Sequence, residues 1–463
     1  MLSLVLAGIS ACGGGGGTSE PEPPPPTSPA PPQPPTGLLT NEQLATPADS
    51  NAGLADSVSG DWFAANAEIV RSLTEDSDFS DLGFIDPLVR NKRLILLGES
   101  SHGVEEFSSA KIRLIKYLHE QQGYNVLALE GGLFDCERGN ELLTEVSAFA
   151  AMRSCAFGVW RTDTVLELFE YVRSTQLTAN PLRITGFDVQ SSGDRIGERP
   201  ARTAGMFQKL SPARAEEVLA IEQNYRNLID SALGASSGSD RGIVDLRNAL
   251  PFLQNDYATL AAELRANIDI VTADGEFSVR DVEIVAQYLQ SSPYFAEQNA
   301  NRFMLDSGGL ARDLGMARNL IALAEVIYPD EKILVWAHNA HLRHQGTGFL
   351  PDANMGKWVH DSLEAQMYTV GFYMYRGSHA FNDRSIQTVS PPLNNSLEAI
   401  FHTRRLAWLF LDLENADTGP GSEWLRTPTP TWAWGQFQIN LQLHDEYDAL
   451  FIVDSVNPPN YVN

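Results

Sequence analysis

The sequence has few cysteines, few positive charges and no long apolar runs in its main part. Only three cysteines occur among 463 residues, at Cys12, Cys136 and Cys155. Lysine and arginine number 33 against 59 aspartates and glutamates, which gives a formal net charge of −26 at pH 7. Such an acidic chain repels nucleic-acid phosphates and anionic lipid headgroups. We therefore expect no nucleic-acid partner and no basic membrane-binding patch.

Signals for a membrane span and for a metal site are also missing. A spanning helix needs about 20 consecutive apolar residues, and every apolar run after residue 50 is shorter than that. The chain contains no HExxH motif and no cysteine spacing typical of zinc ligands. We expect no transmembrane helix in the folded part, and we assign no metal and no cofactor.

The start of the chain is typical of an exported lipoprotein. Residues 1–11 are apolar or small, and Cys12 ends an Ile-Ser-Ala-Cys sequence that resembles the bacterial lipobox, whose cysteine is lipidated. The basic start of a signal peptide is missing, since the first lysine or arginine is Arg71. We predict a signal peptide and lipidation cysteine at 1–12, with the protein exported and lipid-anchored to the bacterial cell envelope through Cys12.

The residues after Cys12 have the composition of a tether. Residues 13–17 are all glycine, and residues 21–35 contain ten prolines. Glycine runs are flexible, proline runs are extended, and neither can bury enough apolar surface to fold. We predict a disordered tether at 13–55 that holds the folded domain off a membrane, on the periplasmic side or at the cell surface.

Short apolar runs predict a parallel sheet in the remaining chain, from about residue 56 to residue 463. The early runs are continuous rather than alternating, as in parallel strands that are covered on both faces. Helical patterns at 105–122 and 163–174 alternate with the runs. The strand candidates are Arg93–Gly98, Asn125–Glu130, Leu182–Asp188, Ile333–Ala337, Tyr368–Tyr375, Leu406–Leu413 and Ala449–Val453. The fold class predicted is α/β, with a mainly parallel central sheet flanked by helices.

The pattern becomes purely helical between about 200 and 327. Helical stretches run through 213–233, 241–265, 277–291 and 308–327. We predict a helical insertion that packs beside the sheet. A literal G-x-S-x-G sequence lies within it, around Ser236, but the nucleophile elbow of that motif needs a preceding strand. A loop between two helices is the expected structure there.

Ionisable side chains follow four of the predicted strands. Because ligands of open α/β sheets bind at the carboxyl ends of the strands, we expect these side chains to gather. They are Glu99 and His102 after the first strand, Glu130 after the second, Asp188 in the third, and His338 and His341 after the fourth. A neutral histidine can take a proton from water, and a carboxylate on its other ring nitrogen fixes its tautomer. The set therefore predicts a site that activates water.

Two cations on the helix after the first strand are candidates for charge stabilisation. Lys111 and Arg113 could stabilise the oxyanion that forms when water attacks an ester. A solvated helix face is the alternative interpretation for both. A metal ion held by the same histidines and glutamates is a second mechanism that these residue types allow.

These motifs together resemble the erythromycin esterase family. They are Gly-Glu-Ser-Ser-His-Gly at 98–103 followed by Glu105-Glu106-Phe107, Leu129-Glu130, Gly186-Phe187-Asp188-x-Gln190, Arg312-Asp313-x-x-Met316, Ala337-His338-Asn339-Ala340-His341, Met355-Gly356, Gly371 and Asp448–Ile452. The resemblance extends over roughly residues 60–460, with the motifs in order and at fitting spacing. It implies hydrolysis of an ester or lactone by water, as in the ring opening of erythromycin-type macrolides.

The resemblance also implies roles for individual residues. His102 matches the general base, and Glu99, Glu130, His338 and His341 match further active-site positions. Lys111 falls where some members carry arginine. We expect Glu99 or Glu130 to orient His102, and the two later histidines to handle the substrate or the leaving group. Lys111, Arg113 and Asp188 are the predicted substrate contacts.

Three hypotheses about function follow. The first is a hydrolase of carboxylic esters or lactones that acts on a small-molecule ester or macrolactone, which would fit antibiotic resistance. The second is a metal-dependent hydrolase of another envelope or environmental ester. The third is a surface binding protein without turnover, which has no need of the base at His102. Some family members are linked by name to polysaccharide biosynthesis, so the family implies the reaction better than the substrate.

The remaining two cysteines are 19 residues apart, on either side of a helical stretch. In an exported protein, Cys136 and Cys155 could form a disulfide. Two free thiols are the alternative.

Overall fold

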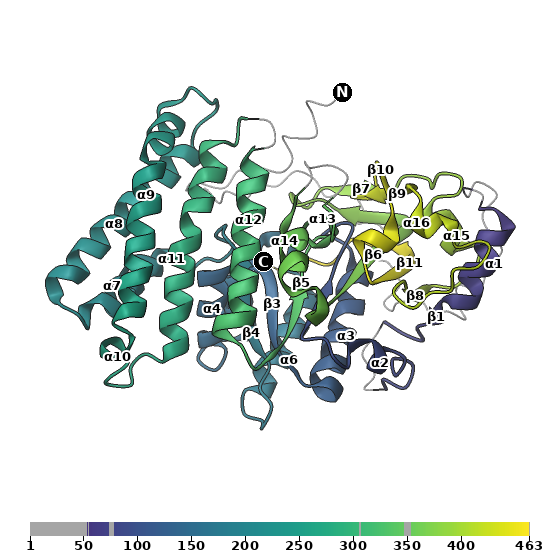
Figure 1. Ribbon diagram of the computed structural model, residues 1–463, viewed down its shortest axis with the longest axis horizontal. Coiled ribbons are helices and arrows are strands. Elements are labelled where there is room, and N and C mark those ends of the chain that lie inside the picture. Colours follow the sequence, from purple (N-terminus) through teal and green to yellow (C-terminus); the bar gives the residue numbers. More distant parts are fainter. Residues whose placement is uncertain (1–52, 54, 74–77, 305–306, 347–352, 463) are drawn as a thin grey trace, which may run out of the picture.

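The computed structural model describes residues 53, 55–73, 78–304, 307–346 and 353–462. A nine-stranded sheet runs through the middle of the molecule, and helices lie on both of its faces (Figure 1). The strands are β1 (Glu68–Ile69), β2 (Leu94–Leu97), β3 (Tyr124–Gly132), β4 (Arg183–Asp188), β5 (Lys332–Trp336), β6 (Met367–Ala380), β7 (Ile386–Thr388), β8 (Trp408–Asp412) and β11 (Ala449–Val456), with β9 (Thr429–Ala433) and β10 (Phe437–Leu441) as a separate hairpin.

Six neighbouring strands of the sheet run parallel. The order is β1-β8-β11-β6-β2-β5-β3-β4, and β11 through β4 are parallel to one another, while β1, β7 and β8 pair antiparallel. The predicted α/β class is thus confirmed, and so are all seven predicted strands. The strands that the sequence did not predict are β1, β7, β9 and β10, which are short or lie apart from the main sheet.

The continuous apolar strands place apolar side chains on both faces of the sheet. Alternate residues of a strand point to opposite faces. In β2, Ile95 and Leu97 join the core under the early helices, whereas Leu94 and Leu96 join the core under the helical insertion. Because both faces are buried, apolar and polar residues do not alternate along β2.

The early helices cover one face of the sheet. They include α2 (Ile85–Val89), α3 (Glu105–Gln122), α4 (Leu133–Leu142), α5 (Ala148–Cys155), the short 3₁₀ turn η3 (Gly158–Trp160) and α6 (Asp163–Thr175). Helix α3 begins with two glutamates in its first turn and ends at Gly123, whose φ of 72° is the left-handed C-cap conformation. The helices predicted at 105–122 and 163–174 are therefore confirmed as α3 and α6.

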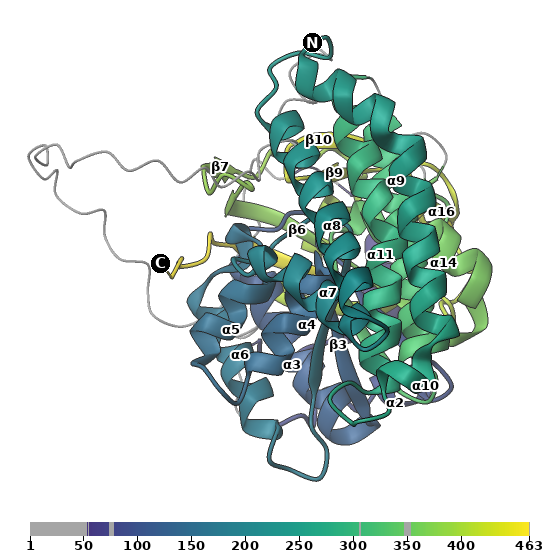
Figure 2. The same cartoon turned by 90° about the vertical axis from the view of Figure 1, so that its left-hand side faces the viewer.

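The stretch between β4 and β5 forms a layered helical body beside the sheet (Figure 2). Its elements are η4 (Ile196–Glu198), α7 (Arg199–Gln208), α8 (Pro212–Leu233), α9 (Arg241–Ala266), α10 (Ile268–Val271), α11 (Val279–Ala300), α12 (Ser307–Ala322) and the π-helical turn η5 (Leu323–Ile327). The G-x-S-x-G sequence lies in the loop between α8 and α9. Ser236 is exposed and bonds to Asp240 there, so the predicted loop is confirmed.

The rest of the chain adds short elements around the strand ends. They are α13 (Asn339–Leu342), α14 (Met355–Leu363), η6 (Glu364–Gln366), α15 (Leu397–His402), α16 (Glu423–Arg426) and α17 (Leu443–Glu446), together with α1 (Ser57–Asn66) from the start of the described chain. Helices α1, α15 and α16 pack on β8 and β11 in a third apolar core that contains Phe63, Phe401 and Leu425.

The two cysteines of the folded part are joined by a disulfide. Cys136 on α4 and Cys155 on α5 have an S–S distance of 2.02 Å, and both are fully buried. The bridge packs against the end of β3, because a Cβ atom added to Gly131 would lie 2.9 Å from Sγ of Cys136. The sequence left open whether Cys136 and Cys155 pair, and in the structure they do.

The predicted signal peptide, Cys12 and nearly all of the predicted tether lie outside the described residues. Within the described ranges, no helix is both long enough and apolar enough to cross a bilayer.

Candidate functional site

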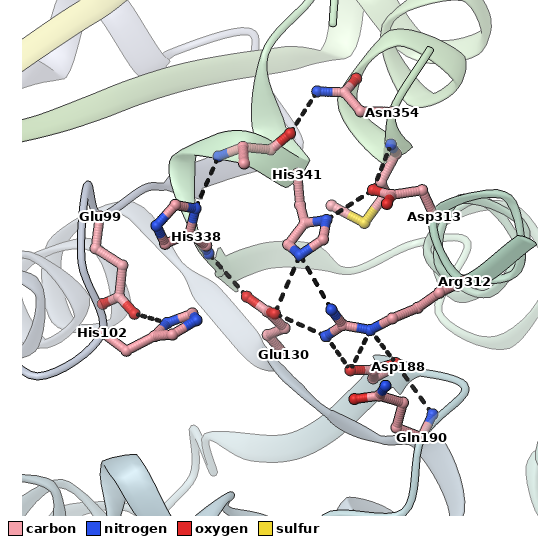
Figure 3. A network of polar contacts seen from close by, with 12 residues as sticks. Glu99, His102, Glu130, Asp188, Gln190, Arg312, Asp313, His338, His341 and Asn354 are labelled. Carbon is pink, nitrogen blue, oxygen red and sulfur yellow. Dashed lines mark hydrogen bonds and ion pairs between the residues drawn. The ribbon is translucent and has the colours of Figure 1, made fainter. Parts of the chain in front are cut away.

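Four adjacent parallel strands bring the predicted site residues to one edge of the sheet. Strands β2, β5, β3 and β4 are neighbours, and each is followed or ended by an ionisable side chain. Figure 3 shows the side chains of Glu99, His102, Glu130, Asp188, His338 and His341 gathered in one network. The expected cluster at the carboxyl ends of the strands is therefore present.

The residues after β2 form a carboxylate–imidazole dyad. Nδ1 of His102 lies 2.6 Å from Oε1 of Glu99. Glu99 is fully buried, and His102 is 7% exposed. The bond favours the tautomer that carries its proton on Nδ1 and a lone pair on Nε2. No hydrogen bond from the described residues reaches Nε2, which points in Figure 3 towards the side where Glu130 lies. Of the two glutamates considered as partner of His102, the structure places Glu99 on Nδ1.

Two tryptophans hold the Glu99 carboxylate in place. The indole N–H of Trp160 donates to Oε1 and that of Trp336 donates to Oε2, each at 3.1 Å. Charge-assisted bonds of this kind are the strong ones in a buried site. They fix the carboxylate without adding a charge, so His102 is held by a rigid partner.

Lys111 lies behind this dyad instead of facing a substrate. Its ammonium donates to Oε2 of Glu99 and lies 4.3 Å from the ring centroid of Trp336. The side chain is fully buried, and burial lowers the pKa of Lys111 to about 8 although the Glu99 carboxylate favours its charged form. The predicted substrate contact is therefore corrected: protein encloses the whole ammonium, which neutralises and fixes Glu99.

Arg113 points away from the site. Its guanidinium donates to Asp81 and to the backbone oxygens of Ser72 and Asp78. An α-helix has 3.6 residues per turn, so side chains two positions apart point about 200° from each other. Lys111 and Arg113 cannot both face the strand ends, and the prediction that placed both there is wrong for Arg113.

Glu130 is a fixed negative charge in the middle of the network. Its Oε2 accepts from the backbone N–H of His338 at 2.8 Å, and its Oε1 accepts from Arg312 at 2.9 Å. Burial by itself would raise the pKa of Glu130, but the charges of His341, His102 and Arg312 lower it to about 2. Glu130 therefore stays ionised at neutral pH and does not act as a proton donor.

Arg312, at the start of helix α12, joins two carboxylates. Its Nε and Nη2 atoms donate to Asp188 at 2.5–3.2 Å, and Nη2 also donates to Glu130. Asp188 has no exposed side-chain surface, whereas the Arg312 side chain is 12% exposed. The predicted substrate contact at Asp188 is corrected accordingly. Asp188 lies behind Arg312 and orients it, and of these two side chains only that of Arg312 has exposed surface.

His341 belongs to a second carboxylate–imidazole dyad. Its Nδ1 lies 2.6 Å from Oδ1 of Asp313, which also accepts from the backbone N–H of Met355. Its Nε2 lies 3.4 Å from Oε1 of Glu130. Burial opposes the charged form, but the Asp313 and Glu130 carboxylates outweigh it and raise the pKa of His341 above its usual value. His341 is thus suited to carry a proton near neutral pH.

His338 is a neutral ring fixed by the backbone. Its Nδ1 accepts from the N–H of Ala340 at 3.0 Å, and its Nε2 donates to the carbonyl oxygen of Ser100 at 3.2 Å. Burial, aided by the nearby charge of His102, lowers the pKa of His338 well below its usual value. With both nitrogens occupied, the ring supports its neighbours and is not free to transfer a proton.

The residues that the sequence analysis did not single out are mostly aromatic. Trp160 and Trp434 contact the ring of His102, Trp434 also stacks on the ring of His338, and Trp336 donates to Glu99. Nothing in their spacing distinguishes them from core residues. Arg312 and Asp313 were seen only as part of a family motif, and their contacts follow from how α12 packs beside β4.

The donor set does not favour a bound metal ion. In the described part of the chain, no three His, Cys, Asp or Glu side chains are arranged to hold one. His338 has both ring nitrogens in hydrogen bonds to the backbone, and His102 has one nitrogen on Glu99. Metal-binding histidines need a free nitrogen aimed at a shared point.

A hollow of about 470 Å³ lies elsewhere, between α1, α15, α16 and the start of β9. Its walls include Asp56, Glu423 and Trp424. None of the described residues that line it is a histidine, and none belongs to the network around Glu99 and Glu130. Water activation needs a base, so the chemistry of the side chains, and not the size of the hollow, locates the site.

Fold and site define an α/β protein whose buried carboxylate–imidazole dyads lie at the carboxyl ends of parallel strands. The model of the family described as erythromycin esterase matches residues 119–456, and the chain belongs to that family. The predicted resemblance is thus confirmed.

Three relatives illustrate the range of the family. The Bacillus subtilis (strain 168) protein named "Putative hydrolase YbfO" is 28% identical over 393 residues, covering 82% of this chain and 87% of that one. Erythromycin esterase type I of Escherichia coli is 22% identical, covering 59% and 67%. A solved mutant of erythromycin esterase EreC in its open conformation has a TM-score of 0.62 at 17% identity, covering 83% and 96%, and shares the fold. Family and relatives identify this protein as a hydrolase.

Proposed function

We propose that the protein hydrolyses carboxylic esters or lactones by direct attack of water, with His102 as the general base. The observation that carries the proposal is the Glu99–His102 bond of 2.6 Å, which leaves Nε2 of His102 free. A histidine whose Nδ1–H is held by a carboxylate can take a proton at Nε2, and the carboxylate stabilises the resulting imidazolium.

The proposed reaction has two steps. In the first, the water oxygen bonds to the carbonyl carbon while a water proton passes to Nε2 of His102. The resulting oxyanion lies near the positive charge of Arg312 and of protonated His341. In the second, the carbon–oxygen bond to the leaving group breaks and His341 gives its proton to the departing alkoxide. The acid and the alcohol leave, and the proton on His102 returns to His341 through water.

The first substrate to test is a macrolide lactone. Two of the related curated proteins carry the name erythromycin esterase, and such an activity would confer resistance to the antibiotic. The residues of the network themselves support the reaction class and not a particular acyl group, so other esters belong in the same test.

The test is mass spectrometry of erythromycin and of a panel of neutral esters after incubation with the full chain purified in detergent. Wild type is expected to add one water to its substrate. His102→Ala is expected to lose at least about a hundredfold in rate, because general-base catalysis contributes on that order. His444→Ala is the control, since this histidine on α17 is 34% exposed in its side chain. Full activity in folded His102→Ala would contradict the assignment.

We further propose that the enzyme acts outside the cytoplasm, held to the cell envelope by lipid on Cys12. The motif at 9–12 and the glycine- and proline-rich stretch behind it support this. The buried disulfide supports it too, because disulfides persist in oxidising compartments. An enzyme in that place would meet an antibiotic before it reached the cytoplasm.

A further inference from the structure

One aromatic residue at the site has a backbone conformation that bulky side chains rarely adopt. Trp434 has a φ of 54° and the next residue, Gly435, has a φ of 61°. The N–H of Gln436 donates to the carbonyl oxygen of Ala433 at 3.2 Å. Two successive positive φ values closed by this bond are typical of a type I′ turn, which normally takes asparagine, aspartate or glycine. A tryptophan in the left-handed region is strained.

The surroundings of the turn hold this strained conformation. The N–H of Trp434 donates to the carbonyl oxygen of Ser100 at 2.8 Å, and the same oxygen accepts from His338. The carbonyl oxygen of Gly435 accepts from the N–H of Ser390 at 2.7 Å. Strain that is held in this way is concentrated at functional sites, where the side chain has a task that a relaxed residue could not perform.

The indole of Trp434 forms one wall beside the base. It stacks on the ring of His338 at 4.4 Å and meets the ring of His102 edge-on at 5.0 Å. Phe381 lies against its other side, with the ring centroids 6.1 Å apart. Trp434 and Phe381 are both only half-buried. Part of an aromatic surface is therefore open next to the catalytic histidine.

The residues around His102 and His338 thus differ in kind. Trp434 and Phe381 are aromatic and uncharged. Arg312 is a cation that is held by Glu130 and Asp188. The two aromatic side chains offer no charge to pair with an ionic group, whereas a neutral apolar group would bury surface on the indole.

We propose that Trp434 determines substrate specificity: with Phe381 it forms a subsite for a neutral apolar group attached to the ester next to the bond that is cleaved. The inference rests on the proposed esterase function. It adds a substrate class and a residue that touches the substrate without transferring a proton.

The test compares hydrolysis of p-nitrophenyl acetate, butyrate and octanoate by wild type and by Trp434→Asn. Asparagine suits the turn, so the backbone is preserved while the indole is removed. Wild type is expected to favour the octanoate in kcat/KM. Trp434→Asn is expected to reduce that preference, measured as the ratio of kcat/KM for the octanoate to kcat/KM for the acetate, at least tenfold. Trp434→Phe is expected to keep most of the preference. The control is Trp432→Phe, on the same hairpin.

A binding measurement separates this inference from the proposed function. The probe is octanoyl p-nitroanilide, an amide of the same shape as the octanoate ester, titrated by calorimetry. Tight binding by wild type and at least tenfold weaker binding by Trp434→Asn support the subsite, even if no ester is cleaved and the esterase proposal fails. Equal binding by both proteins, no binding by wild type, or an equal loss of activity towards all three esters in Trp434→Asn would overturn the role of Trp434.

Discussion

His338 and His341 are three residues apart, yet their surroundings favour opposite protonation states. His338 accepts a backbone N–H and donates to a backbone oxygen, so it is neutral, and burial lowers its pKa. His341 has Asp313 on Nδ1 and Glu130 near Nε2, which raise its pKa. One short segment after β5 therefore holds one ring that favours its neutral form and one that favours its charged form.

Asp313→Asn tests the role of His341 through the pH dependence of kcat. The Asp313 carboxylate stabilises the imidazolium, so its removal lowers the pKa of His341. If protonated His341 is the acid, activity is lost as pH rises through that pKa, and the alkaline limb moves to lower pH in the variant. At pH values well below the limb, kcat changes much less.

The control for this substitution is Asp361→Asn on helix α14, which neutralises an exposed carboxylate that pairs with Lys357. An unchanged alkaline limb in Asp313→Asn would remove His341 as the acid. It would leave His102 as the base, because the two histidines have different carboxylate partners.

Among the elements, the end of β3 shows how local geometry positions a charge. Strand β3 continues past Glu130 through two glycines, with a register shift against β4 between Leu129 and Gly132. A Cβ on Gly186 of β4 would lie 2.4 Å from the carbonyl oxygen of Gly131, so this close approach of the two strands needs glycine at position 186. The disulfide between α4 and α5 packs against Gly131.

Removing that disulfide is expected to cost stability. The bridge spans 19 residues of sequence, and closing a loop of this size contributes about 3 kcal/mol by restricting the unfolded chain. The double variant Cys136→Ser/Cys155→Ser should lower the free energy of unfolding by about that amount in urea titrations. Cys12→Ala is the control, because it removes a cysteine that takes no part in the Cys136–Cys155 bridge. Identical masses with and without reductant, after alkylation, would show that the bridge does not form.

At the scale of the whole molecule, the main question is in which cellular compartment the protein acts. The net charge of −26 keeps the protein away from anionic surfaces, and among its described residues no helix could span a bilayer. The membrane anchor that we propose is the lipid on Cys12.

Cys12→Ala tests the anchor. Wild type expressed in a bacterial host is expected in the membrane fraction, because two or more acyl chains hold a protein stably to a bilayer. The variant is expected in the soluble fraction with its hydrolase activity intact. His444→Ala should fractionate like wild type. Equal membrane retention of Cys12→Ala would rule out lipidation at this position.

Much of the site could be predicted from the sequence because neighbouring parallel strands end at the same edge of the sheet. Once β2, β3, β4 and β5 are recognised as apolar runs, the residues that follow them must lie close together. That argument placed Glu99, His102, Glu130, Asp188, His338 and His341 correctly without any contact being known. It could not place Arg113, because the direction of a helical side chain depends on how the whole helix is rotated against the sheet.

The amino-acid sequence by itself determined the fold class, the strand ends that carry the chemistry and the family. Periodicity and motif order are local properties of the chain, so they can be read without the fold. Only the tertiary structure decided which carboxylate orients His102, that Lys111 supports Glu99, that Asp188 supports Arg312, and that Trp434 lies beside His102. These are contacts between residues far apart in the chain, and they depend on packing angles and backbone turns that no local pattern records.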